Sequence, residues 1–247
     1  ATGADPLVGD GAGMLTQIPH QFFSEECQKI GFNIPQAGQY SVGFFFTPRE
    51  EKIQNLIKSE IEKIASASEQ PLIGWRCVPT DNSILSQDPE ILAAEPMHWQ
   101  GFFTRPNHLS DDEFERKIYI LRRTISNSVR DQIEKAEDFY PVSMSARTIV
   151  YKGMFLADQL APYYEDLKDI RFESALALVH QRFSTNTFPS WRLAHPYRMV
   201  AHNGEINTKR GNVNWMEARQ ATLSSPLFGE DIKKIWPVSY EGESDTA

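Results

Sequence analysis

Three short polar stretches in the second half of the chain contain side chains that could bind and activate an amino acid. Arg182 and Thr185 lie in RFSTN, Asn203 and Gly204 lie in HNGEINT, and Asp245 lies in GESDT. A guanidinium at the end of an apolar strand suits bidentate capture of a carboxylate. An aspartate can accept hydrogen bonds from an ammonium group, while an Asn amide and a Gly backbone N–H are two neutral donors suited to an oxyanion.

Each stretch by itself also has an ordinary structural explanation. An Asn-Gly pair is a common turn that leads into a helix. Arg182 could equally form a structural ion pair, and Asp245 could cap a turn or a helix. Taken together, the three stretches offer a carboxylate binder, an ammonium binder and an oxyanion hole. That combination fits an α-amino acid whose side-chain carbonyl is attacked.

The composition argues against several other functions. The 247 residues have a net charge of −8, from 25 basic and 33 acidic side chains, which disfavours a nucleic acid or an anionic membrane as partner. GDGAG near the start lacks the GK[ST] ending of a phosphate-binding loop. There is no apolar run of membrane-spanning length and no signal peptide, so we expect a cytoplasmic protein.

No spacing of ligand residues predicts a metal site. The six histidines are scattered, and the two cysteines, Cys27 and Cys77, lie far apart without a CxxC pattern. We expect both cysteines to be reduced, buried and inert.

The apolar pattern predicts alternating strands and helices in one mixed domain. The isoleucines from Ile53 to Ile64 recur at helical spacing, and Thr47 with Pro48 looks like the start of that helix. Two more helices are expected, over 126–137 and from about 208 to 223. The expected strands cover 40–46, 72–78, 115–124, 147–155, 174–180 and 197–201. Of these, the apolar runs at 174–180 and 197–201 are typical of buried central strands.

RFSTNTFPSW, AHNGEINT and GESDT, in this order, resemble the glutaminase domain of the glutamate synthase large subunit. That domain is a class II glutamine amidotransferase and an N-terminal-nucleophile hydrolase. The stretches GADPLVGDGAGM and SARTIVYKGMF are similar to the same branch of the family. The resemblance runs over residues 1–247 and implies an α+β fold, a four-layer αββα sandwich that is incomplete at both ends.

The resemblance also implies a role for each of the polar side chains. Arg182 would hold the α-carboxylate of L-glutamine, and Thr185 would line the pocket nearby. The Asn203 amide and the Gly204 backbone N–H would form the oxyanion hole, and Asp245 would hold the α-amino group. The reaction implied is hydrolysis of glutamine to glutamate and ammonia, for reductive amination of 2-oxoglutarate.

The sequence departs from the family pattern at the nucleophile. The family uses a cysteine at the mature N-terminus, whose own α-amine serves as the base, whereas position 1 here is alanine. Thr2, Cys27 and Cys77 do not match that position. We therefore expect residues 1–247 alone to be inactive. The alternative is a nucleophile-less module that binds glutamine or serves a structural role.

For the parent enzyme, the resemblance implies FMN and an iron–sulfur cluster, with no cofactor held by this chain. The implied partners are the remainder of the large subunit and a small subunit. The electron donor stays open between NADPH, NADH and ferredoxin.

Overall fold

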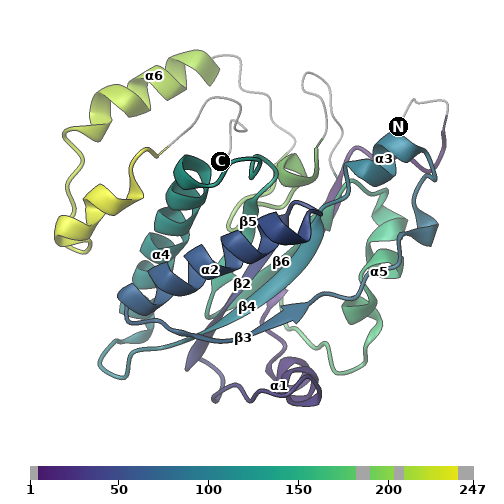
Figure 1. The fold of residues 1–247 in the computed structure, drawn as a ribbon, viewed down its shortest axis with the longest axis horizontal. Helices are drawn as coiled ribbons and strands as arrows, with labels where there is room; N and C mark the ends of the chain where they lie inside the picture. Colours follow the sequence, from purple (N-terminus) through teal and green to yellow (C-terminus); the bar gives the residue numbers. More distant parts are fainter. Residues whose placement is uncertain (1–4, 182–189, 203–208, 239–247) are drawn as a thin grey trace.

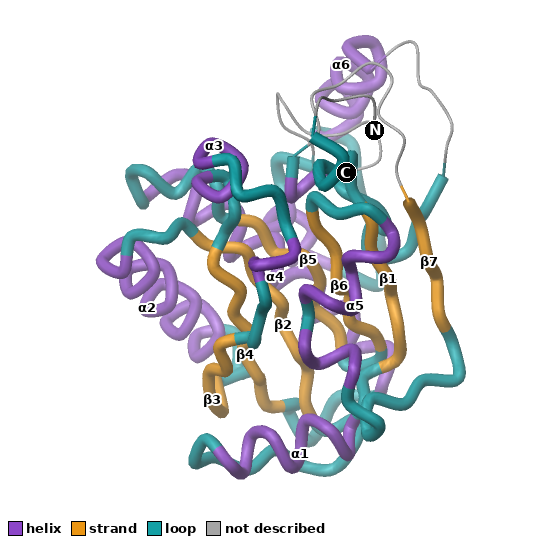
Figure 2. The backbone as a smooth tube through the Cα atoms, turned by 90° about the vertical axis from the view of Figure 1, so that its right-hand side faces the viewer, coloured by secondary structure: helices purple, strands orange, loops and turns teal. Residues whose placement is uncertain are grey.

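Seven strands form two antiparallel sheets in the computed structural model, which describes residues 5–181, 190–202 and 209–238. The first sheet has the order β3-β4-β2-β5 and the second the order β6-β1-β7. Figure 2 shows the two sheets face to face. The strands are β1 (Ala12–Gln17), β2 (Tyr40–Thr47), β3 (Leu72–Cys77), β4 (Met97–Thr104), β5 (Tyr140–Ser145), β6 (Thr148–Gly153) and β7 (Ala177–Gln181).

Two long helices, at 51–67 and 111–132, lie over one face of the first sheet (Figure 1). The α-helices are α1 (His20–Lys29), α2 (Glu51–Ala67), α3 (Pro89–Ala93), α4 (Asp111–Gln132), α5 (Leu160–Tyr163) and α6 (Lys209–Gln220). Short 3-10 turns cover η1 (Asn82–Ile84), η2 (Ala157–Gln159), η3 (Glu165–Lys168), η4 (Trp191–Leu193) and η5 (Gly229–Ile235). No helix in the described ranges is long and apolar enough to cross a membrane.

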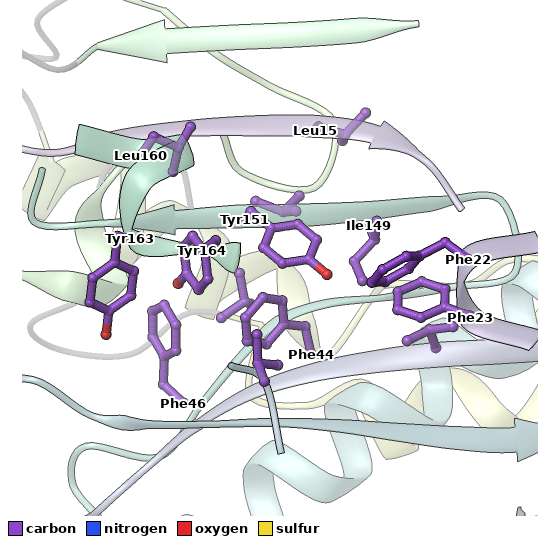
Figure 3. Packing of buried hydrophobic residues seen from close by; sticks show 14 of the residues in the cluster. Leu15, Phe22, Phe23, Phe44, Phe46, Ile149, Tyr151, Leu160, Tyr163 and Tyr164 are labelled. Atoms are coloured by element: carbon purple, nitrogen blue, oxygen red, sulfur yellow. The ribbon is translucent and has the colours of Figure 1, made fainter. Parts of the chain in front are cut away.

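Strand β2 explains the layered core because both of its faces are buried. Phe44 and Phe46 point into the space between the sheets, where Phe44 packs against the rings of Tyr151 and Tyr164 (Figure 3). Phe45, on the opposite face, packs in a second apolar cluster under α2 and α4. Because side chains alternate along a strand, the run YSVGFFF supplies apolar contacts to both layers.

The helix over residues 111–132 corrects the prediction of a strand at 115–124. Phe114, Ile118, Leu121 and Ile125 are fully buried at helical spacing against the first sheet. Glu113 accepts hydrogen bonds from the backbone and side chain of Ser110, which caps the helix start. Basic residues separate the apolar positions, so polar and apolar residues alternate in this segment as they do in a strand. The buried side chains nevertheless recur with the period of a helix.

The helix carrying Ile53 to Ile64 is confirmed, but its predicted start is wrong. Strand β2 continues through Thr47, and α2 begins at Glu51. The pairing of β2 with β4 explains this difference, since Thr47 is paired with Met97 of β4 and is unavailable as a helix cap.

Two predicted buried strands also differ from the structure. Strand β7 exists, but it pairs only with β1 in the described part of the chain, and Val179 is 63% exposed. Residues 197–201 form a turn instead of a strand, closed by the Tyr197 N–H donating to the Val200 carbonyl at 2.8 Å. Cys27 is buried as expected, whereas Cys77 is exposed. The expected α+β class with antiparallel sheets is confirmed.

Candidate functional site

The five predicted site residues lie outside the described residues. Arg182 and Thr185 fall in 182–189, Asn203 and Gly204 in 203–208, and Asp245 in 239–247. The structure does describe the residues that precede these masked ranges, namely Gln181, His202 and Val238. The candidate site is therefore built from the end of β7, the segment 190–202 and the segment leading to Val238.

A row of residues across the second sheet supports the segment 190–202. In the strand register, Gly13 of β1 lies between Lys152 of β6 and His180 of β7. A Cβ atom at Gly13 would lie 2.5 Å from the His195 carbonyl oxygen. Only glycine leaves room for this approach, so the glycine allows His195 to sit on the sheet next to β7.

Ring contacts among histidines bring together the two chain segments that lead into RFSTN and NGEINT. The ring centre of His195 lies 4.7 Å from that of His180 and 5.3 Å from that of His202. His180 is two residues before Arg182, and His202 directly precedes Asn203. Consecutive Cα atoms are about 3.8 Å apart, so the points at which the chain enters RFSTN and NGEINT lie close together.

Lys152 fixes the same segment from the other side. The residue is fully buried, and its Nζ donates a hydrogen bond to the Arg192 carbonyl at 2.9 Å. The ammonium also lies 4.3 Å from the ring centre of Tyr197 and 4.9 Å from that of Tyr140. Sequence reasoning missed this lysine, although a charge inside the apolar run RTIVYKGMF was a signal of a buried polar role.

Helix α4 holds the segment that leads towards GESDT. The Asn127 amide donates to the Trp236 carbonyl at 2.5 Å, and the Arg123 guanidinium donates to the carbonyls of Ile235 and Pro237. These carbonyls belong to three consecutive residues, so one face of α4 fixes the path of the backbone there. Asp245 follows Pro237 by eight residues.

Tyr140 has an unusual electrostatic environment. Burial alone would raise the pKa of its phenol, but the nearby charges of Lys152, Arg198 and Arg122 lower that pKa to about 8. Arg198 also donates a hydrogen bond to the Tyr140 hydroxyl at 3.3 Å. The described groups around Tyr140 thus form a positively charged cluster next to the segment 190–202, which suits a carboxylate-bearing ligand.

Comparison with known proteins gives the family. A family model for class-II glutamine amidotransferases matches residues 1–247. The glutamate synthase [NADPH] large chain of Bacillus subtilis is 43% identical over 246 residues, covering 99% of this chain and 16% of that protein. The corresponding large chain of Azospirillum brasilense is also 43% identical, over all of this chain and 16% of its own length. The glutamate synthase [NADH] of Schizosaccharomyces pombe is 41% identical, with 12% of its length covered.

This chain belongs to the class-II glutamine amidotransferases. It spans about a sixth of the length of the first two relatives and less of the third. All three relatives are glutamate synthases, so the chain is similar to one region of a larger enzyme in each of them.

Neither cysteine of this amidotransferase chain has the surroundings of an activated nucleophile. Burial raises the pKa of the Cys27 thiol to about 12. Burial also raises the pKa of Cys77, and Lys58 and Arg76 offset this only in part. A reactive thiol needs a lowered pKa, so both side chains are poorly suited to attack a glutamine carboxamide.

The described residues of the amidotransferase chain contain no group of three or more His, Cys, Asp and Glu that could hold a metal ion. The His195 ring packs against the rings of His180 and His202, at interplanar angles of 36° and 88°. Their arrangement therefore supports positioning of the backbone more than coordination of a metal.

Proposed function

We propose that this chain binds L-glutamine and acts as the glutaminase part of a glutamate synthase. The observation that carries the proposal is the contact of His195 with both His180 and His202. This contact holds together the described residues that precede the Arg182 and Asn203 stretches, which supports the proposal that both stretches contribute to one site. Family membership and the names of the relatives support the same substrate.

The chemistry proposed is hydrolysis of the glutamine carboxamide through a thioester. Arg182 binds the α-carboxylate, Thr185 lines the pocket and Asp245 binds the α-ammonium group. As a thiolate attacks the carboxamide carbon, negative charge develops on its oxygen, and the Asn203 amide with the Gly204 N–H stabilises that charge. The step needs a nucleophile that neither Cys27 nor Cys77 supplies, so we propose that residues 1–247 alone bind glutamine without hydrolysing it.

The parent enzyme provides the rest of the reaction in this proposal. Ammonia released from glutamine is added to 2-oxoglutarate with reduction, in a part of the enzyme that carries FMN and an iron–sulfur cluster. The partners are the remainder of the large chain and a small subunit, in the cytoplasm. Residues 1–247 are proposed to form part of one domain, with the two sheets as the inner layers of a four-layer αββα sandwich.

Glutamine binding measured by calorimetry tests the proposal. We expect Arg182→Gln and Asp245→Asn each to weaken glutamine binding by roughly ten- to a hundredfold, because each removes a charge-assisted hydrogen bond. Arg147→Gln is the matched control, since this half-exposed arginine pairs with Asp112 away from the site. Glutaramate, which lacks the α-amino group, should bind equally to the wild type and Asp245→Asn.

The same measurements separate the enzyme from its alternative. If the full-length protein binds glutamine but releases no ammonia, it is a glutamine-binding module. If neither the chain nor the full-length protein binds glutamine while both are folded, a structural module remains and the glutaminase proposal is wrong.

A further inference from the structure

Arg122, on helix α4, is a buried arginine whose charge has no evident counter-ion. The residue is only 7% exposed, and its guanidinium centre lies 5.2 Å from the ring centre of Tyr119. Across residues 5–181, 190–202 and 209–238, no oxygen accepts a hydrogen bond from this guanidinium and no carboxylate pairs with it. Burying a charge is costly unless it is paired, so the site is short of negative charge.

The groups around Arg122 add to the positive charge. Burial first, and then the charges of Arg198 and Arg123, lower the pKa of Arg122 to about 9. Arg198 donates to the Tyr140 hydroxyl at 3.3 Å and to the Pro141 carbonyl at 3.1 Å, which fixes its guanidinium over β5. These contacts give Arg198 neutral acceptors only.

The neighbouring elements offer little compensation. Lys152 of β6 also lies over the Tyr140 ring, 4.9 Å from its centre. Glu115 is a carboxylate on the same helix as Arg122, but it accepts hydrogen bonds from the Ala146 N–H and the Ser145 hydroxyl. It also lies about two turns away, or roughly 10 Å along the axis. Tyr140 itself can carry at most one negative charge.

We propose that Arg122, Arg198 and Tyr140 form a carboxylate-binding site between α4, β5 and the segment 190–202. The planar guanidinium of Arg122 is free to form two parallel hydrogen bonds to one carboxylate. Arg198 and the Tyr140 hydroxyl are placed to contact the same group. The ligand is an aspartate or glutamate side chain of the full-length polypeptide, or a small free carboxylate such as a dicarboxylic acid.

Tyr140 provides a local reporter for the test. A carboxylate bound beside it opposes the cations that favour its phenolate, so binding should raise the pH at which Tyr140 ionises. The ionisation is measured in the full-length protein by near-ultraviolet tyrosinate absorbance, as the difference between the wild type and Tyr140→Phe. The probes are sodium acetate and sodium glutarate, with sodium chloride at equal ionic strength as the reference.

A free ligand and an internal one give different results. If the site takes a free carboxylate, Tyr140 ionises near pH 8 in chloride, and saturating glutarate raises this midpoint by about one pH unit. Arg122→Gln should abolish the glutarate response, and Arg147→Gln should leave it unchanged. If an internal side chain fills the site, the midpoint is already high in chloride, and a crystal structure shows that carboxylate hydrogen-bonded to Arg122.

One combination of results overturns the proposal. Tyr140 would ionise at the same pH in chloride, acetate and glutarate, and the crystal structure of the full-length protein would show no carboxylate at Arg122. If Arg122→Gln fails to fold, Arg198→Gln is used in its place, because Arg198 is less buried than Arg122 and is expected to perturb the core less.

Discussion

At the scale of single residues, the interior between the sheets contains ionisable side chains that are held in one state. His98 is almost fully buried, and its Nε2 lies 3.2 Å from the Tyr163 hydroxyl. Tyr163 in turn donates a hydrogen bond to the buried Glu95. Burial lowers the pKa of His98 from 6.5 to about 3, although backbone contacts favour the charged ring. The folded protein therefore keeps this histidine neutral.

The neutral state of His98 predicts a dependence of stability on pH. Between pH 6.5 and about 3, the unfolded chain binds a proton at this position that the folded chain does not bind. The free energy of unfolding should therefore fall by up to about 1.4 kcal/mol per pH unit as the pH drops through this window. Urea unfolding measures this slope. His98→Gln should reduce the slope, and the exposed control His108→Gln should not.

Lys152 is a second ionisable side chain that is buried in the structure. Lys152→Met keeps the apolar stem but removes the hydrogen bond to the Arg192 carbonyl. We expect the variant to be less stable by about 1–3 kcal/mol, the usual value for a hydrogen bond from a charged donor. Lys29→Met, at an exposed lysine, is the control. Equal urea midpoints for the two variants would show that the Lys152 contact adds nothing to stability.

At the scale of elements, β1 is the central strand of the second sheet and carries the contact with the segment 190–202. Its Gly13 lies under the His195 carbonyl, and a Cβ atom at Gly13 would lie only 2.5 Å from the Cβ of Lys152. Strand β1 and the segment 190–202 are thus complementary in shape at Gly13, which is paired with His180 of β7.

Gly13→Ala should push the segment 190–202 away from β1. The added methyl meets backbone and a buried side chain, neither of which can move cheaply. We expect a loss of stability of about 1–3 kcal/mol and weaker glutamine binding. Calorimetry and urea unfolding check both effects. Thr148→Ala, at the far end of β6, is the control, and unchanged binding in Gly13→Ala would contradict the positioning role.

At the scale of the whole molecule, one buried polar network joins the two sheets. Arg76 of β3 forms a bidentate pair with Asp166 of η3, both contacts being 2.7 Å. Tyr151 of β6 donates to the same carboxylate at 2.7 Å, and Gln100 of β4 donates to the Tyr151 hydroxyl at 2.8 Å. The network therefore connects both sheets through a single carboxylate.

Asp166→Leu should be strongly destabilising because it leaves Arg76 buried without its partner. We expect a loss of about 3–5 kcal/mol in the free energy of unfolding. The double variant Arg76→Met with Asp166→Leu should recover much of this loss, since it removes both buried charges. If the double variant is no more stable than Asp166→Leu, the packing of η3 matters more than the ion pair.

Much of the fold could be predicted from the spacing of apolar residues, because most of these residues are buried at that spacing in the structure. The helix through Ile53 and Ile64 and the strand at 40–46 formed where periodicity indicated. The segment 115–124 was mispredicted because its basic residues break up the apolar face, and only packing against the first sheet shows which period applies. The exposure of β7 also could not be predicted from the sequence, since an apolar run does not show whether a strand is central or at the edge of a sheet.

The sequence by itself determined the family and the identity of the proposed glutamine-binding residues, because those residues stand in long, ordered motifs. Their roles remain predictions for mutagenesis. The tertiary structure decided which distant segments meet. It joined His180 to His202 through His195, and it placed Lys152, Arg198 and Arg122 around Tyr140. The physical reason is that these contacts connect residues far apart in the chain, so they depend on how the sheets and α4 pack.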